Sequence, residues 1–209
     1  MKNLMIGLFL ALGASGLSAG EAQRGVIQAS YTTGDADYTI SGTKYDGDLD
    51  GTGLSGRFYP TEDIYVSLSM GSAELDLVGT TFDIDTTSFG AGLVFGERID
   101  YVAGEGSEQR LGFDYTDSET KVNGTTTSSD STDIEYAVEG GLGSGVVGGL
   151  YFSTDTDDLF SSNSYGFGLY KSLTDNLIVG GGYEFVDAED DDGDKAEASG
   201  MSLGIGFVF

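Results

Sequence analysis

The sequence predicts an all-β protein, an antiparallel up-and-down transmembrane β-barrel of about ten strands. Three observations predict this fold. Large apolar residues recur at every second position in segment after segment, and this is the period of a β-strand. The residues between them are mostly glycine and serine, which are too small to form the polar coat of a soluble sheet. The connections between segments are alternately short and long, as in a transmembrane barrel.

The predicted strands follow one another without a segment of convincing helical periodicity. An alternative with eight strands stays open, because "YVAGEGSEQR" (101–110) interrupts the alternation around the fifth and sixth segments. In chain order, the alternating segments begin near Gly25, Gly51, Ile64, Thr87, Ile99, Ile134, Val146, Tyr165, Leu177 and Met201.

The connections place both termini at the end of the barrel that has the tight turns. No linker indicates a second domain, so one barrel is expected over residues 23–209. The short connections are predicted at 59–63, 95–98, 143–145 and 171–176. The long polar connections are predicted as loops at 35–48, 75–84, 117–133, 155–163 and 186–198.

The two faces of each strand predict which side meets lipid. The large apolar face would meet hydrocarbon, and the glycine and serine face would line a narrow lumen with some free space. Closure of the barrel would pair every backbone N–H and C=O, as hydrocarbon requires. Aromatic residues near the strand ends are expected to form interfacial girdles: Tyr31, Phe58, Tyr59, Tyr101, Tyr115, Tyr151, Phe152, Tyr170, Phe185 and Phe209.

The first 22 residues have the pattern of a Sec signal peptide. Lys2 is followed by an apolar run over 4–12 and then by small residues. The run is too short for a membrane-spanning helix, which needs about 20 apolar residues. Cleavage is expected between residues 19 and 22, after Ala19, Gly20 or Ala22.

Composition excludes several functions. The chain has 35 acidic and 9 basic residues, a net charge of −26, which argues against nucleic acid as a partner. It contains no His and no Cys, so it lacks the commonest general base and the thiolate ligands of zinc. "GSGVVG" (143–148) fits a dinucleotide-binding pattern, but a strand rather than a helix follows it. We therefore expect neither an enzyme nor a cofactor.

Taken together, these features resemble the small outer-membrane β-barrels of Gram-negative bacteria, that is, the porin-like, OmpA-transmembrane-domain-like and opacity-type proteins. The most specific point of resemblance is the last strand, "GMSLGIGFVF", with Leu203, Ile205 and Phe207 in alternation and Phe209 at its end. The resemblance implies location in the outer membrane, contact with its lipid and lipopolysaccharide, and recognition of this strand by the outer-membrane assembly machinery.

Charged residues at lumen parity are the first candidate site. Continuing the alternation places the following side chains inside the barrel: Arg57, Glu108, Arg110, Asp114, Glu135, Glu139 and Glu184. They could pair as a plug or line a polar channel, and a ten-stranded barrel lies between the filled and the open sizes. Two arginines among five acids would favour cations in any pore.

Acidic segments are the second candidate site. "DGDLDG" (46–51) repeats the first half of a calcium loop, but Arg57 stands where the closing Glu should be. The carboxylates are therefore only weak candidates for divalent cations, also as bridges to lipopolysaccharide phosphates: Asp46, Asp48 and Asp50 in this segment, and Asp190, Asp191 and Asp192 in "DAEDDDGD".

Three functions follow as hypotheses. The first is a porin-like passive channel for small hydrophilic solutes or ions. The second is a surface-interaction barrel whose acidic extracellular loops bind a partner outside the cell. The third is a barrel that only supports the envelope.

Overall fold

The computed structural model describes residues 25–156, 160–190 and 193–209, so the predicted signal peptide lies outside the described residues. No helix in these ranges is long and apolar enough to cross a membrane. The described residues form ten strands: β1 (Gly25–Ile40), β2 (Thr43–Phe58), β3 (Ile64–Leu77), β4 (Thr80–Asp100), β5 (Glu105–Val122), β6 (Thr125–Gly143), β7 (Val146–Asp155), β8 (Phe160–Ser172), β9 (Leu177–Asp190) and β10 (Lys195–Val208).

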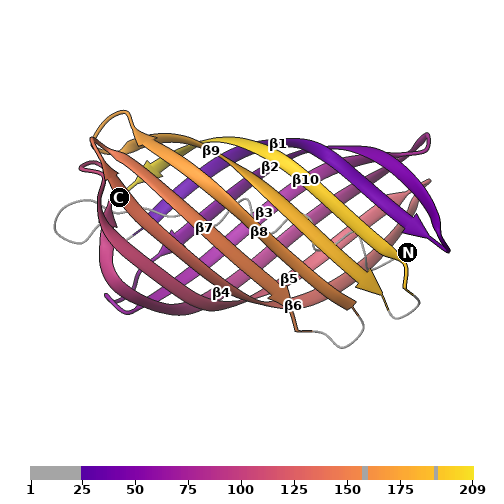
Figure 1. The fold of residues 1–209 in the computed structure, drawn as a ribbon, viewed down its shortest axis with the longest axis horizontal. Helices are drawn as coiled ribbons and strands as arrows, with labels where there is room; N and C mark the ends of the chain where they lie inside the picture. The colour runs from indigo at the N-terminus through magenta and orange to yellow at the C-terminus, as the bar shows by residue number, and fades with distance from the viewer. Residues whose placement is uncertain (1–24, 157–159, 191–192) are drawn as a thin grey trace.

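The strands form one closed antiparallel barrel, in which each strand pairs with its neighbour in sequence and β1 pairs with β10 (Figure 1). The closing ladder runs from Val26↔Val208 to Thr39↔Lys195. Next to this ladder, Gly25 and Phe209 exchange two backbone N–H···O=C hydrogen bonds of 3.1 Å each. The predicted fold is therefore confirmed with ten strands rather than eight. The C-terminus lies at the left-hand end of Figure 1, and the β1–β2 hairpin lies at the right-hand end.

The predicted alternation holds on β10 without interruption. Met201, Leu203, Ile205 and Phe207 are exposed, while the small residues between them face the interior. The same pattern around the barrel forms an apolar belt. Its members include Ile27, Tyr31, Leu54, Phe58, Ile64, Leu68, Met70, Phe89, Leu93, Phe95, Leu111, Phe113, Tyr115, Tyr136, Leu150, Phe152, Tyr165, Phe167, Leu169, Phe185, Met201, Leu203, Ile205, Phe207 and Phe209. A soluble protein of this size does not expose such a continuous band, and lipid is what covers it.

The prediction of long polar loops was wrong at 35–48, 75–84 and 117–133; strands also enter 155–163 and 186–198, whose residues 157–159 and 191–192 lie outside the described residues. The strands continue through 35–48, 75–84 and 117–133 and meet at two-residue turns, Ser41–Gly42, Val78–Gly79 and Asn123–Gly124. All six turn residues have positive φ angles, between 49° and 80°, as the two-residue turns that match the twist of β-strands require. The acidic segments are therefore rigid β-hairpins.

The polarity of the two faces reverses where these hairpins leave the apolar belt. The inner face becomes apolar: Leu75 and Ile84 are fully buried in a cluster with Ala36, Tyr38 and Leu49. The outer face becomes acidic. We call the outward carboxylates beyond the belt the acidic collar: Asp35, Asp37, Asp46, Asp48, Asp50, Glu74, Asp76, Asp83, Asp85, Asp117, Glu119, Asp130, Asp187, Glu189 and Glu197. The strands thus have a lipid-facing part and a water-facing part.

The opposite end of the barrel carries both ends of the closed meander, Gly25 and Phe209, and the remaining connections. The turn predicted at 95–98 was misplaced, because β4 continues to Asp100 through an irregularity in its pairing with β5. The chain then turns through 101–104, with Ile99 and Tyr101 buried against Val147 and Ile178. Since the connections that project farthest from such barrels lie outside the cell, we assign the long hairpins and the acidic collar to the outer side.

The aromatic prediction was partly wrong. Tyr59, Tyr101 and Tyr170 are buried, and the alternation of β7 turns Tyr151 inward between the outward Leu150 and Phe152. The remaining six aromatic residues of the predicted girdles are exposed: Tyr31, Phe58, Tyr115, Phe152, Phe185 and Phe209. The four inward tyrosines instead help to fill the lumen.

The apolar belt makes one prediction about stability. Replacing Leu203, which is 67% exposed, by arginine places a charge in hydrocarbon and should lower the free energy of unfolding by about 2–4 kcal/mol. Glu197→Arg, on the same face of β10 but in the acidic collar, serves as the matched control and should have little effect. Urea unfolding in lipid vesicles measures both variants. Equal costs for the two variants would show that Leu203 does not face lipid.

Candidate functional site

The middle of the lumen contains the predicted charged residues. Arg57, Glu108, Arg110, Glu139 and Glu184 are each no more than 3% exposed. Glu135 is also buried, and Asp114 is partly buried. These residues come from β2, β5, β6 and β9, so the closed barrel brings together side chains that are far apart in the sequence. We call them the lumen charge cluster.

Arg110 is the centre of the lumen charge cluster. Its Nη1 lies 2.9 Å from Glu108 Oε1, and its Nη2 lies 3.0 Å from Glu139 Oε1. Tyr59 donates a hydrogen bond of 2.8 Å to Glu108, and Tyr101 donates one to Glu139. The two carboxylates therefore share one guanidinium and are further satisfied by phenol groups, as ion pairs away from water require.

Arg57 is buried without an ion pair. The described residues place no carboxylate oxygen within 4.0 Å of its guanidinium, and its Nε and Nη2 have no hydrogen-bond partner there. Its Nη1 lies 3.5 Å from Tyr59, and its Cζ lies 5.5 Å from the centre of the Tyr65 ring. The aromatic contact stabilises the cation only partly.

Three acids of the cluster also lack an ion-pair partner in the described part of the chain: Asp114, Glu135 and Glu184. Ser67 donates a hydrogen bond of 3.0 Å to Asp114, whereas Glu184 Oε1 has no partner in the same residues. Buried charge without compensation is costly. This part of the lumen is therefore suited to taking up water, protons or cations.

The expected free space of the lumen is largely taken by side chains. The lumen glycines lie under larger groups from neighbouring strands: a Cβ on Gly166 would lie 2.6 Å from the Tyr151 ring, and one on Gly149 would lie 2.9 Å from Glu139 Cγ. Cβ atoms on Gly112 and Gly180 would collide with tyrosine rings. Glycine is thus required here by close approach, and it does not widen the lumen.

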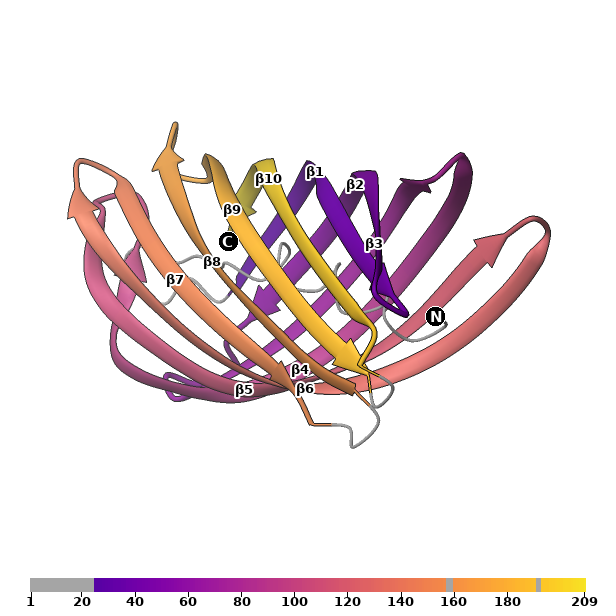
Figure 2. The ribbon, with the colours of Figure 1, turned by 45° about the vertical axis from the view of Figure 1, so that its right-hand side comes forward.

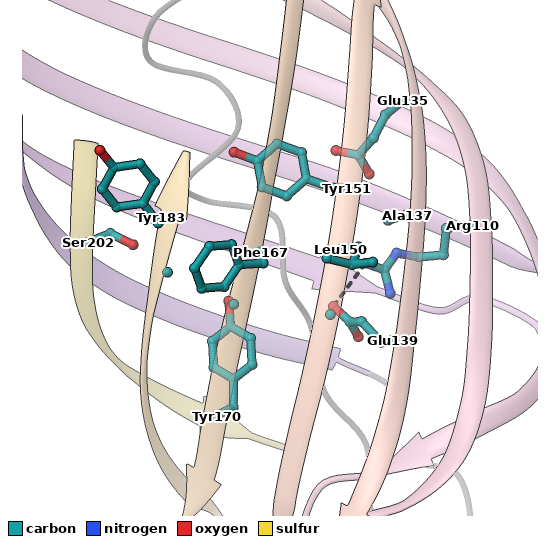
Figure 3. Close-up of a pocket in the computed structure, with 13 residues that line it drawn as sticks. Arg110, Glu135, Ala137, Glu139, Leu150, Tyr151, Phe167, Tyr170, Tyr183 and Ser202 are labelled. Carbon is teal, nitrogen blue, oxygen red and sulfur yellow. Dashed lines mark hydrogen bonds and ion pairs between the residues drawn. The ribbon is translucent and has the colours of Figure 1, made fainter. Parts of the chain in front are cut away.

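A small cavity remains beside Arg110 and Glu139 (Figure 3). Its lining includes Glu135, Tyr151 and Tyr170. The volume of the cavity that the centre of a water molecule can occupy is about 40 Å³. Because one buried water needs about 10–15 Å³ by this measure, the cavity has the size of about three waters. It is far too small for a sugar or an amino acid.

Apolar layers lie on both sides of the lumen charge cluster. Towards the periplasm these are Val26, Ile99, Tyr101, Val147, Tyr170, Ile178 and Val208. Towards the outside they are the buried residues around Leu75 and Ile84. Buried Ser118 and Thr120 of β5 lie at the level of Ile84, so the interior passes from apolar to charged to a mixture of apolar and hydroxyl side chains, all of them packed.

The candidate cation ligands do not converge. Asp46, Asp48 and Asp50 point outward from one face of β2, so successive carboxylates are about 7 Å apart along the strand. Asp50 accepts a hydrogen bond of 2.7 Å from Tyr31. No group of three acidic side chains that could hold a metal occurs among the described residues. The side chain of Asp190 and both Asp191 and Asp192 lie outside them.

The acidic collar instead forms rows across the strands. Asp35 faces Asp48, and Asp48 faces Asp76. Like charges directly opposite each other destabilise a sheet. The described part of the collar carries three lysines, Lys44, Lys121 and Lys195, each paired with an acid.

The lysine pairs act locally on the collar. Lys121 lies 2.6 Å from Asp85, and its hydrogen bond holds the pKa of that carboxyl below its usual range. Lys44 lies 3.0 Å from Asp37 and lowers the pKa of Asp37 in the same way. Most of the collar's negative charge remains without a basic partner and faces the medium.

Sequence reasoning missed the tyrosines of the lumen. Tyr59 stands two residues after Arg57 and so has the same inward parity, and Tyr151 stands between two outward apolar residues. The position of these two tyrosines in the two-residue alternation therefore already indicates that they point inward. Tyr101 had no such signal, because the irregular end of β4 sets its direction.

Comparison with known proteins supports the fold. No protein-family model matches the chain, and no curated protein matches it in sequence. Among solved structures, the translocator domain of the autotransporter NalP from Neisseria meningitidis is similar with a TM-score of 0.53 and 9% identity, over 90% of each chain. Neisserial surface protein A follows with a TM-score of 0.44 and 15% identity, over 88% of this chain and 97% of that chain. The attachment invasion locus protein Ail of Yersinia pestis follows with 0.42 and 19%, over 90% and 100%.

The fold and the apolar belt together define the class of the protein. The likeness to the NalP domain shows the barrel fold, and the belt supplies the surface that lipid must cover. The protein is thus a transmembrane β-barrel with the fold of a bacterial outer-membrane domain.

Arg110 provides a test of the lumen charge cluster. In Arg110→Met, Glu108 and Glu139 lose their common partner while much of the buried volume is kept. The free energy of unfolding should fall by about 3–5 kcal/mol, because a buried charge is left uncompensated. Lys44→Met breaks an exposed pair and should cost less than about 1 kcal/mol. Urea unfolding in vesicles compares the two, and a similar small cost for both would contradict the network.

Proposed function

We propose that the protein is a surface-interaction barrel, whose acidic hairpins bind cationic partners outside the cell. The observation that carries the proposal is the reversal of polarity along the strands. In the part of the strands that extends past the apolar belt, the inner face carries the buried cluster around Leu75 and Ile84, and the outer face carries the acidic collar. A surface with one sign of charge attracts partners of opposite charge and speeds their encounter.

The rigidity of the hairpins supports this function. Their two-residue turns and continuous ladders hold the carboxylates in fixed rows, such as Asp35, Asp48 and Asp76. Repulsion within a row is relieved when a cationic group settles between its members. A fixed array of this kind suits a polypeptide or polyamine with several positive charges.

Labelled decalysine is a suitable probe, added to the purified barrel in detergent. Binding should weaken steeply as salt is added, because exposed charges are screened. Replacing Asp35, Asp48 and Asp76 by asparagine should weaken it roughly tenfold at low salt, since each exposed pair contributes about 0.2–1 kcal/mol. Fluorescence anisotropy gives the affinities.

The matched control removes three acids at the periplasmic end, as Glu62→Gln, Asp63→Asn and Asp175→Asn. These residues are exposed, and the net charge changes by the same amount. The control should bind decalysine nearly as well as the parent protein. Equal losses in the two triple variants would mean that net charge, and not the collar, attracts the probe.

A narrow channel for cations is the second candidate function. The small cavity and the charges without ion pairs, Arg57, Glu135 and Glu184, favour it. The apolar layers on both sides of the cluster must separate for ions to pass. We rank it second because these layers close the lumen.

Planar-bilayer recording tests the channel. A conducting barrel should prefer cations, and Arg57→Ala and Glu184→Gln should change its unitary conductance in opposite directions, because they remove charges of opposite sign. Absence of unitary conductance, or conductance that ignores both changes, would remove this candidate. A barrel that neither conducts nor binds decalysine would be left with a structural role in the envelope.

A further inference from the structure

Among the described residues, β6 has a long segment beyond the apolar belt that pairs with a neighbouring strand on one side only, and we call it the free edge. β6 pairs with β5 up to the turn, ending at Val122↔Thr125. On its other side, its ladder with β7 begins only at Asp133↔Asp155. The described residues therefore give 125–131 a strand partner on one side alone. In Figure 2 the β5–β6 hairpin extends towards the right, well beyond the end of β7.

The free backbone groups can be assigned by alternation. Thr132 C=O accepts a bond of 2.8 Å from Thr156 N and so points towards β7. In an antiparallel strand, backbone groups of every second residue point the same way. The N–H and C=O of Thr126, Ser128 and Asp130 therefore point away from β5, and the side chains of these residues are exposed.

This edge has one of the usual protections, the charge of the exposed Asp130, and lacks the others. Proteins block exposed edges with lysine, proline, bulges or very short strands. The segment "TTTSSDS" (125–131) contains neither lysine nor proline, and its pairing with β5 is regular throughout. Threonine favours extended backbone. The edge is thus a regular template for an additional strand.

Acidic side chains next to the free edge favour a partner strand with basic side chains. Asp130 lies directly opposite Asp117, and Ser128 lies opposite Glu119, all on the outer face. Neither Asp117 nor Asp130 forms an ion pair among the described residues. A strand added beside β6 would place its own outward side chains within reach of Asp130. A second copy of this chain, with its net charge of −26, would add repulsion there.

We propose that the free edge of β6, residues 125–131, docks an extended segment of another polypeptide that carries lysine or arginine at alternate positions. Backbone hydrogen bonds to Thr126, Ser128 and Asp130 give affinity, and the acids on the outer face give preference for basic side chains. The inference rests on the proposed function and names the class of its partner.

The test uses a labelled seven-residue peptide of alternating lysine and valine, added to the full-length barrel in detergent. Ser128→Pro removes one edge N–H, and the β5–β6 ladder is kept because this N–H points away from β5. The variant should bind about tenfold more weakly, through one lost bond and a blocked approach. Ser128→Ala keeps the N–H and should bind like the parent. Heat-modifiable mobility on unboiled gels checks that both variants are folded.

Two further peptides separate the contribution of backbone hydrogen bonds from that of charge. A lysine–valine peptide N-methylated along its backbone keeps its charge but cannot form a ladder, and it should lose at least tenfold in affinity. A glutamate–valine peptide keeps the backbone and should bind at least tenfold more weakly. If the methylated peptide binds as well as its parent peptide, or Ser128→Pro has no effect in a folded barrel, strand addition is overturned.

The failure of strand addition can be told from the failure of the proposed function. If the methylated lysine peptide and decalysine both bind, and the Asp35, Asp48 and Asp76 variant weakens both, the acidic collar binds cations without using the edge. If no cationic peptide binds, both proposals are wrong. If the glutamate–valine peptide binds as tightly as the lysine–valine peptide, the edge docks strands without preference for charge, and the stated partner class is wrong.

Discussion

The structure depends on the requirement that every backbone N–H and C=O inside hydrocarbon be bonded within the protein. An antiparallel meander meets it only by joining its first strand to its last, and the β1–β10 ladder does so over the full length of both strands. Closure determines the inside as well. Ten strands enclose a space that must be filled, and the lumen tyrosines and the Arg110 pairs fill it over glycines that leave room for them.

Outside the lipid, backbone groups no longer need a partner within the protein, and the polar and apolar residues exchange faces along the strands. Water can bond to free backbone groups and to carboxylates, so the outer face becomes acidic and the apolar residues move inside around Leu75 and Ile84. Closure is no longer enforced either. β7 ends at Asp155, and within the described residues the rest of β6 pairs with β5 only. The acidic collar and the free edge are therefore both consequences of leaving the membrane, and both can act on partners because they meet water.

The membrane-spanning part of the fold was predictable because lipid imposes a strict period of two. The last strand shows this most clearly, with Leu203, Ile205 and Phe207 outward and glycine or serine inward. The sequence predicts loops in place of the hairpins because the apolar parity switches sides there: Ala36 and Tyr38 face inward while Asp35 and Asp37 face out. A short apolar side chain between acids is a weak signal. The direction of Tyr101 could not be read at all, since a pairing irregularity sets it.

The candidate site also has a part that the sequence predicts and a part that it does not. Parity alone placed Arg57 and Glu184 at lumen positions, but it could not tell that Arg110 is shared by two carboxylates while Arg57 has none. That difference depends on strand register, which fixes which charges lie opposite each other across the barrel. Register also decides the meaning of the acids. The same alternation that keeps Asp46, Asp48 and Asp50 from converging on a metal aligns Asp48 with Asp35 and Asp76, and an aligned row has the geometry of the extended cationic partner that we propose rather than that of a single ion.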